Sequence, residues 1–343
     1  MARMLRINTD LDEKRILLHI EGIPFLKSVS ISRFRHPWPP FFAVRVMGHH
    51  RCNFHLNHPM KFFQQGASVL VPDGMELPQA LLRITHLGIG AHQDDLEFMA
   101  FQGIAACFQS AGQWFGGVTC TNGAGSSRAG AYARYSDEEM QAVRREEQNL
   151  AARVGRYGYM AQLDHPSSHV KSPDHNTLRD DLVQILRGCR PEIVYTHQPA
   201  DKHETHIGVM VAVLEAIREL PASHRPKAVH GCEVWRDLDW MNDSDKAIHN
   251  VSGHEVLAGA LNGIFDSQIA GGKRYDLAVL GRRRANATFF SSHMTDAADS
   301  LAFAMDLTPL IQNDDLDLVD YTMEYVERFS RSVRSALEKR LGR

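Results

Sequence analysis

Hydrophobic and polar positions change their pattern along the chain near residue 82. Before that point, short apolar runs of strand-like composition are separated by Pro, Gly and Asn residues. The runs lie at 16–20, 29–31, 41–46 and 68–71. Because no long helical period accompanies them, we predict that residues 1–82 form a small β-rich N-terminal region.

From residue 83 onward, apolar runs of strand length alternate with segments of helical period. We expect strands at 84–89, 118–121, 159–163, 193–196 and 227–235. We expect helices at 98–108, from 136, around 178–186, at 209–220 and at 318–341, in a mostly helical pattern after residue 253. This alternation predicts an α/β domain over residues 83–343, with a parallel sheet covered by helices on both faces.

The helix that begins near residue 136 has a specific start signal. Ser136 is followed by Glu139, which is the spacing of a capping box. We predict one buried apolar stripe along this helix, formed by Met140, Val143, Leu150 and Val154.

Composition narrows the class of protein without naming a function. Hydrophobic residues make up 43% and charged residues 23% of the 343 positions, which is typical of a soluble globular enzyme. A net charge of -3 gives no electrostatic case for a nucleic-acid partner. The five cysteines are scattered and odd in number, so we expect a reduced, cytoplasmic environment. We find no signal peptide or membrane-spanning run, and the oligomeric state stays open.

Two clusters of histidine and acidic residues follow predicted strands. His92, Asp94 and Asp95 come after the strand at 84–89, and His203 and His206 follow the strand at 193–196. Ligands collect at the carboxyl ends of strands in α/β sheets, so we expect the clusters to meet. His92, Asp95 and His206 would supply two imidazoles and one carboxylate to Zn²⁺, leaving one position for water. The same donors suit Fe²⁺, so the ligand types do not fix the metal.

Simpler interpretations of these residues stay open at this level. Asp94 or Asp95 could cap the following helix, with Glu97 completing a capping box. His203 and His206, taken alone, are typical of surface histidines. The combination of the two clusters favours the metal site over these interpretations.

The clusters resemble the motifs of the LmbE-like and PIG-L-like de-N-acetylase superfamily. Residues 91–95, Ala-His-Gln-Asp-Asp, are similar to the family's Ala-His-Pro-Asp-Asp motif, and 197–206 to a second motif that ends in His-x-x-His. Residues 121–123 resemble its Thr-Asp-Gly turn and 144–148 its Arg-x-x-Glu helix. The likeness covers residues 83–290.

This resemblance implies a Rossmann-like, mostly parallel sheet and a zinc-dependent N-deacetylase. The substrate would be a small-molecule N-acetylglucosamine-type amino sugar or a glycoconjugate. By motif position, His92, Asp95 and His206 would bind the metal. Metal-bound water would attack the acyl carbon, with Asp94 as general base and a protonated His203 stabilising the oxyanion.

The resemblance also places Arg144 and Asn122 at the substrate. On the residues alone, Arg144 could be a solvated charge paired with Glu147 or Gln148. Two departures from the family pattern concern the surroundings of the site. Gln93 replaces the usual proline, and residues 265–268 stand where members often have His-x-Ser-Gln.

Other functions stay open on this sequence. One alternative is another zinc-dependent amidase or hydrolase with a non-sugar substrate. A second is a non-catalytic sugar-binding protein on the same fold, although a binding protein has no need of an acid such as Asp94 beside the metal. A nucleotide-binding protein is disfavoured, because Gly88-x-Gly90 lacks the third glycine of the dinucleotide fingerprint.

Overall fold

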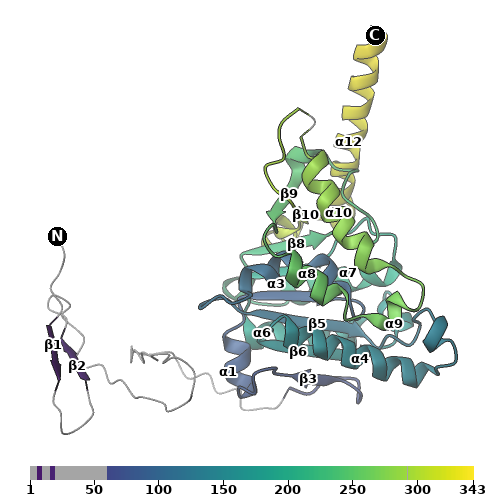
Figure 1. The fold of residues 1–343 in the computed structure, drawn as a ribbon. Coiled ribbons are helices and arrows are strands. Elements are labelled where there is room, and N and C mark those ends of the chain that lie inside the picture. Colours follow the sequence, from purple (N-terminus) through teal and green to yellow (C-terminus); the bar gives the residue numbers. More distant parts are fainter. Residues whose placement is uncertain (1–5, 10–15, 20–59, 292) are drawn as a thin grey trace. The chain divides into compact units, whose positions relative to one another are not determined.

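The computed structural model describes residues 6–9, 16–19, 60–291 and 293–343. The chain divides into two compact units, 1–55 and 56–343. In the first unit, β1 (Arg6–Thr9) pairs antiparallel with β2 (Ile16–His19) (Figure 1). Strand β2 falls on the predicted run at 16–20, whereas the runs at 29–31 and 41–46 lie outside the described residues.

The second unit is built on an eight-stranded sheet of order β3-β6-β5-β4-β7-β8-β10-β9. Its five central strands run parallel: β4 (His86–Gly90), β5 (Phe115–Thr121), β6 (Tyr159–His165), β7 (Ile193–His197) and β8 (Ala228–Cys232). Antiparallel pairings add β3 (Ser68–Leu70) at one edge, and β10 (Leu301–Asp306) and β9 (Lys246–Asn250) at the other. The predicted mostly parallel α/β sheet is therefore confirmed.

Helices cover both faces of this sheet (Figure 1). On one face, apolar residues of α1 (Leu77–Leu82), α6 (Asn176–Cys189), α7 (Glu204–Arg218) and α11 (Thr308–Gln312) join one core cluster. The other cluster takes residues from α2 (Asp95–Met99), α3 (Phe101–Cys107), α4 (Asp137–Val154) and α8 (Glu255–Asn262). The remaining helices are α5 (Ser167–Val170), α9 (Asp266–Ile269), α10 (Tyr275–Phe289) and α12 (Leu318–Leu341).

The end of the predicted N-terminal region already belongs to the α/β unit. Strand β3 pairs with β6, with Val69 opposite Ala161. Helix α1 buries Ala80 and Leu81, and Leu81 joins the core beneath α6. Strand β3 falls on the predicted run at 68–71, and its pairing with β6 makes it an edge strand of the large sheet. The division into compact units falls at residue 55, and the domain boundary at 82 stays a prediction.

After residue 253 the described chain is mostly helical, as expected, and strand β10 is the exception. Its segment, Leu-Ala-Phe-Ala-Met-Asp, lies between β8 and β9 and is buried over its first five residues. Short continuous apolar runs do not distinguish a buried strand from a helix. Helix α12, in contrast, spans the predicted residues 318–341.

Helix α4 begins as predicted but buries a different face. Ser136 and Glu139 form the capping box. Leu150 is 47% and Val154 38% exposed, so the predicted apolar stripe is wrong at these positions. Met140 is buried, and the other buried residues of the helix are Arg144, Glu147, Gln148, Ala151 and Ala152. This polar face is buried because it packs against hydrogen-bonding partners from other segments, described below.

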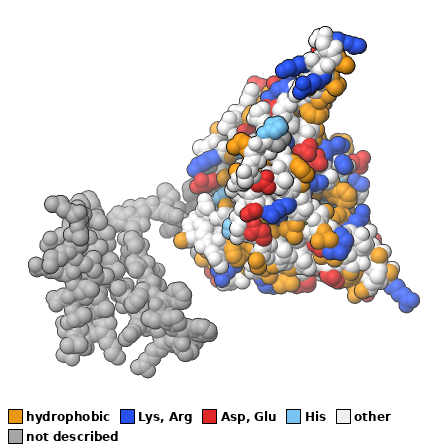
Figure 2. Space-filling model, turned by 45° about the horizontal axis from the view of Figure 1, so that its top comes forward, with side chains coloured by type: hydrophobic (Ala, Val, Ile, Leu, Met, Phe, Trp, Pro, Cys, Tyr) orange, Lys and Arg blue, Asp and Glu red, His pale blue; other side chains and the backbone are white. Residues whose placement is uncertain are grey.

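The visible surface carries both signs of charge, and the cysteines of the described residues are unpaired. Figure 2 shows Lys and Arg side chains interspersed with Asp and Glu over the visible face of residues 60–343. The four cysteines of the described part, at 107, 120, 189 and 232, form no disulfide. In that same part, no helix combines the length and apolar character needed to cross a membrane.

Candidate metal centre and its cavity

The two histidine-acid clusters meet because their strands are neighbours. Strand β4 pairs in parallel with β7, so the turn after Gly90 and the turn after His197 lie at the same edge of the sheet. Helix α2 begins at Asp95 and α7 at Glu204. The sheet thus brings together residues about a hundred positions apart in the sequence.

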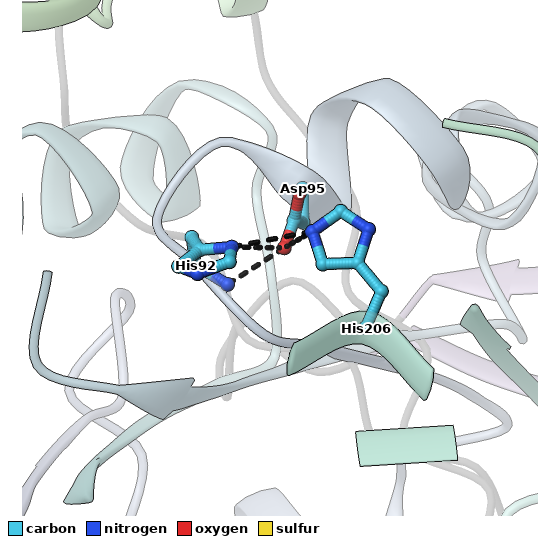
Figure 3. Close-up of side chains that lie close together, drawn as sticks. All are labelled: His92, Asp95 and His206. Atoms are coloured by element: carbon cyan, nitrogen blue, oxygen red, sulfur yellow. Dashed lines mark hydrogen bonds and ion pairs between the residues drawn. The ribbon is translucent and has the colours of Figure 1, made fainter. Parts of the chain in front are cut away.

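His92, Asp95 and His206 converge on one point (Figure 3). Asp95 Oδ2 lies 3.3 Å from His92 Nδ1 and 3.4 Å from His206 Nε2, and the two ring nitrogens are 3.2 Å apart. One ligand atom from each residue falls within 4.8 Å of the others. Two nitrogen donors and a carboxylate aimed at one point fit a tetrahedral Zn²⁺ or an Fe²⁺ site.

Asp201 orients His206 for this arrangement. Its Oδ2 lies 3.3 Å from Nδ1 of His206, and its Oδ1 accepts a hydrogen bond from the backbone N–H of His203. A proton held on Nδ1 leaves the lone pair of Nε2 free to face His92 and Asp95. Carboxylates commonly orient metal-binding histidines in this way. The sequence motif contains Asp201, but its role could not be assigned before the side chains were placed.

A second grouping, His197 with Asp201 and His206, is less suited to a metal. His197 Nε2 accepts the backbone N–H of Ala91 at 3.0 Å, so that lone pair is already used. The His197 ring stacks on His206 with centroids 3.8 Å apart. Because burial lowers the pKa of His197 to about 4, the ring is neutral at pH 7. His197 therefore packs against His206 and supports the grouping of His92, Asp95 and His206.

The capping alternatives do not describe the acidic residues. Asp94 is the N-cap of α2 but makes no side-chain capping bond. Asp95 turns back instead, and its Oδ2 accepts the backbone N–H of His92 at 2.6 Å. Burial alone would raise the pKa of Asp95, but His206 and His197 lower it well below its usual range. Asp95 is thus held as a carboxylate among three histidines.

The backbone of Asp94 has an unusual conformation, and its side chain is buried. Its φ of 103° is unusual for any residue other than glycine. Asp94 is 4% exposed, and its Oδ2 lies 3.2 Å from Arg144 Nη2. Burial raises the pKa of Asp94 well above its ordinary value, although Arg144 opposes this. A buried carboxylate with a raised pKa is suited to exchanging protons near neutral pH.

A buried network behind Asp94 fixes its backbone. The N–H of Asp94 donates to Gln148 Oε1 at 3.1 Å. Gln148 Nε2 in turn donates to Glu97 Oε1 at 2.9 Å, and Tyr157 OH donates to the same oxygen at 2.7 Å. All three supporting residues are 1% exposed or less. The polar face of α4 therefore reaches the turn that carries the metal cluster.

Arg144 also belongs to this buried face, so the solvated-charge alternative is wrong. Arg144 is 4% exposed, and its guanidinium donates to the backbone oxygen of Gln93, to Ser126 Oγ and to Asp94. Glu147, one suggested partner, instead accepts two hydrogen bonds from Ser267. Arg144 lines the cavity but is largely committed to the protein.

Asn122 shapes a loop, and the structure does not place it among the residues that line the cavity. Its Oδ1 accepts the N–H of Ala124 at 3.2 Å. The next residue, Gly123, has a φ of 74°, and a Cβ there would lie 2.6 Å from Gln93 Oε1. Gln93, at the position of the family's proline, is buried and donates to the carbonyl oxygen of Thr121 at 3.1 Å. The glutamine that replaces the family's proline therefore links the turn of the candidate metal site to β5.

His203 is placed at the cluster, but as a neutral ring. It is the N-cap of α7, and its Nδ1 accepts the backbone N–H of Thr205 at 3.3 Å. Burial, with His206 and His92 nearby, lowers the pKa of His203 to about 4. This direction favours a neutral ring at neutral pH over the protonated imidazole that the resemblance implies. The remaining proton sits on Nε2, where the ring can still donate one hydrogen bond.

A cavity of about 520 Å³ opens beside the cluster. His92, Asp94, Asp95 and His203 line one part of it. Other walls come from segments far along the chain, including Trp235, Tyr275 and Phe303. The volume is within the range of sites that hold drug-sized ligands.

Comparison with known proteins identifies a family domain in the part of the chain that contains this site. Residues 87–217 match the family model described as PIG-L, GlcNAc-PI de-N-acetylase. The chain carries a PIG-L family domain. No curated protein matches the sequence. The matched range contains the metal cluster, Asp94, Arg144 and His203, but it ends before the cavity walls at Trp235, Tyr275 and Phe303.

Solved structures share the fold of the PIG-L domain and its surroundings. GalB, the 4-carboxy-2-hydroxymuconate hydratase from Pseudomonas putida KT2440, has a TM-score of 0.51 at 19% identity, over 65% of this chain and 96% of its own. A conserved protein from Thermus thermophilus has a TM-score of 0.51 at 19% identity, over 64% of this chain and 93% of its own.

The N,N'-diacetylchitobiose deacetylase from Pyrococcus horikoshii has a TM-score of 0.50 at 18% identity, over 69% of this chain and 88% of its own. These likenesses show a common fold. Because a hydratase and a deacetylase both have it, the fold does not choose between their reactions.

Proposed function

We propose that this protein is a metal-dependent hydrolase that removes the acetyl group from an N-acetylated amino sugar. The observation that carries the proposal is the buried Asp94 carboxylate beside the cluster of His92, Asp95 and His206, in one cavity. The PIG-L domain supports the same reaction class. A small-molecule substrate fits the cavity volume of about 520 Å³.

His92, Asp95 and His206 are the proposed metal ligands. When bound, a divalent metal would act as a Lewis acid and lower the pKa of water. Zn²⁺ and Fe²⁺ both fit two imidazoles and one carboxylate. The Asp201 carboxylate holds the His206 ring in the orientation that this role requires.

Asp94 is the proposed general base. Its carboxylate would accept a proton from the attacking water and then give it to the departing amine of the sugar. Both transfers need a group whose pKa is near the working pH, and burial moves Asp94 in that direction. Arg144 would keep the carboxylate in position through the 3.2 Å contact between Nη2 and Oδ2.

His203 is the proposed donor to the oxyanion that develops on the acyl oxygen when the acyl carbon is attacked. Its Nδ1 is used by Thr205, so Nε2–H is the proton available to the substrate. The neutral ring can donate its Nε2–H to the oxyanion, and it keeps this donor as the pH rises. Arg144 and Asn122 remain proposed substrate residues, Arg144 at the cavity wall and Asn122 through the loop that it orders.

The test combines elemental analysis with a substrate screen. Purified protein should contain close to one equivalent of zinc or iron and release acetate from at least one N-acetylated amino sugar. Acetate release from non-sugar amides alone would replace the proposal with the other amidase alternative. A full metal content with no acetate release from any amide would favour a binding protein. Hydration of an unsaturated acid would indicate the reaction named for the Pseudomonas putida structure.

A further inference from the structure

The cavity has an inner wall that lies outside the matched PIG-L domain. We define this inner wall as Glu233, Arg283, Ala302 and Phe303, all of which line the cavity and are 7% exposed or less. Glu233 directly follows β8, Arg283 lies on α10, and the other two belong to β10. Positions 275, 278, 279, 282 and 283 also line the cavity, so one face of α10 covers it.

Arg283 is fixed in place with one donor unused. Its Nη2 donates to the backbone oxygens of Glu97 and Phe98 at 2.8 and 2.9 Å, and the guanidinium lies 4.3 Å from the centre of the Phe101 ring. Among the described residues, its buried Nη1 has no hydrogen-bond partner. Burial lowers the pKa of Arg283 to about 9, so it still carries its charge at pH 7.

Glu233 is fixed in the same manner, with one acceptor unused. Its Oε1 accepts from Asn286 Nδ2 at 2.5 Å and from the backbone N–H of Phe303 at 3.3 Å. Its Oε2 is buried, and the described part of the chain offers it no partner. Leaving a buried polar atom unpaired is costly, and ligand groups commonly provide the missing partner.

An aromatic wall joins this inner wall to the reacting groups. The Trp235 ring lies 6.1 Å from His203, and Tyr275 lies 5.8 Å from Trp235 and 5.7 Å from Phe98. Phe98 is the residue whose backbone oxygen Arg283 binds. Trp235 is 39% exposed, so the wall extends from the solvent toward the inner wall. One ligand could therefore contact both the reacting groups and the inner wall.

We propose that Glu233 and Arg283 form a subsite for a hydroxyl-bearing unit attached to the N-acetylated sugar. An unused acceptor and an unused donor on one wall match a group that offers both, and sugar hydroxyls do so. The surrounding Phe98, Ala302 and Phe303 would contact the less polar faces of that unit. This inference rests on the proposed deacetylase function and assigns it a substrate larger than a monosaccharide.

The test uses two substrates whose second ring is six-membered in both, but only one of these rings carries hydroxyl groups and a ring oxygen. One is N-acetylglucosamine β-linked to glucose, and the other is its cyclohexyl β-glycoside. A site built to bind hydroxyls rejects the analogue that lacks them, because its buried groups stay unpaired. We expect kcat/KM for acetate release to be at least about tenfold higher for the glucose-linked substrate.

Glu233→Gln is the decisive variant. The glutamine oxygen can keep the bonds from Asn286 and Phe303, whereas its Nε2 replaces the unused acceptor by a donor. We expect it to reduce the preference for the glucose-linked substrate about tenfold, mainly through KM. Glu324→Gln makes the same chemical change on α12, where the side chain is 64% exposed, and should leave the preference unaltered. Val279→Trp, at a partly exposed cavity position of α10, should lower kcat/KM for both extended substrates relative to the monosaccharide.

Several results would overturn the subsite. They are equal kcat/KM for the two substrates in the parent enzyme, a preference for the cyclohexyl glycoside, or a folded Glu233→Gln with the parent's preference. If no sugar releases acetate, the proposed function fails on its own. The subsite is then tested by calorimetric binding of the two glycosides. Tighter binding of the glucose-linked one, lost in Glu233→Gln, would retain the subsite, and equal binding would reject it.

Discussion

Replacing Gln148 by Leu should both destabilise the protein and slow the proposed reaction. Gln148 links the backbone N–H of Asp94 to the Glu97 carboxylate through bonds of 3.1 and 2.9 Å. Leucine has a similar size but neither accepts nor donates. The variant would therefore leave the Asp94 N–H without its acceptor and remove one of the two side-chain donors to Glu97 Oε1.

The magnitude follows from the two groups that lose their partner. An unpaired buried N–H costs about 1–3 kcal/mol. Burial raises the pKa of Glu97 to about 7, so its carboxyl is partly ionised at neutral pH, and the lost hydrogen bond to it costs about 0.5–3 kcal/mol. Since local relaxation recovers part of this, we expect the free energy of unfolding to fall by about 3 kcal/mol. For a unit of this size, that corresponds to a decrease in Tm of roughly 5 °C.

The effect on activity follows from the backbone of Asp94. Its φ of 103° is held by surrounding contacts, and the Gln148 bond is the one made to its N–H. A displacement of the base by about 1 Å can cost on the order of a hundredfold in rate. We expect kcat to fall between about tenfold and a hundredfold while the metal content is retained.

Thermal unfolding followed by circular dichroism, together with acetate release, measures both effects. Leu150→Ala is the matched control, because it lies two residues further along α4 and is 47% exposed. That control should change stability by no more than about 0.5 kcal/mol. A Gln148→Leu variant with the parent's Tm and kcat would refute the argument that this network holds Asp94.

Three further predictions address the ligands, the base and the acid stability. His206→Ala and Asp95→Ala should each purify with little bound metal by elemental analysis, and a full equivalent in both would remove these residues from the ligand set. Asp94→Asn should keep its metal and lose about 10²–10⁴ in kcat, the typical worth of a general base; near-parent turnover would assign the proton transfer elsewhere. Burial lowers the pKa of His249 to about 4, so its contribution to stability is complete above about pH 6.5 and is lost as pH falls toward 4. His249→Leu should therefore flatten the acid limb of Tm against pH, and an unchanged limb would contradict this.

The sequence by itself determined features that depend on local pattern. The strand, turn and helix around His92 and Asp95, the capping box at Ser136 and the bounds of α12 all follow from periodicity or from short signals. The meeting of the two clusters also followed, because neighbouring parallel strands end at the same edge of a sheet.

The tertiary structure alone decided which polar residues are buried. Apolar periodicity predicted Leu150 and Val154 on the inner face of α4, yet that face carries Arg144 and Gln148. Polar residues can be buried when other segments supply hydrogen bonds, and those partners lie about fifty positions away in the sequence. No local sequence pattern indicates these hydrogen-bond partners.

Charge states and the lining of the cavity also depend on residues that are distant in the sequence. His203 was expected as a cation, but its charge depends on burial and on His206 and His92, which only the folded chain places beside it. The inner wall joins Glu233 after β8, Arg283 on α10 and Phe303 on β10. The sequence pointed to the residues of the candidate metal site, because its motifs are local. Only the packing of distant segments decided what surrounds it, because burial and hydrogen bonding are properties of the neighbours.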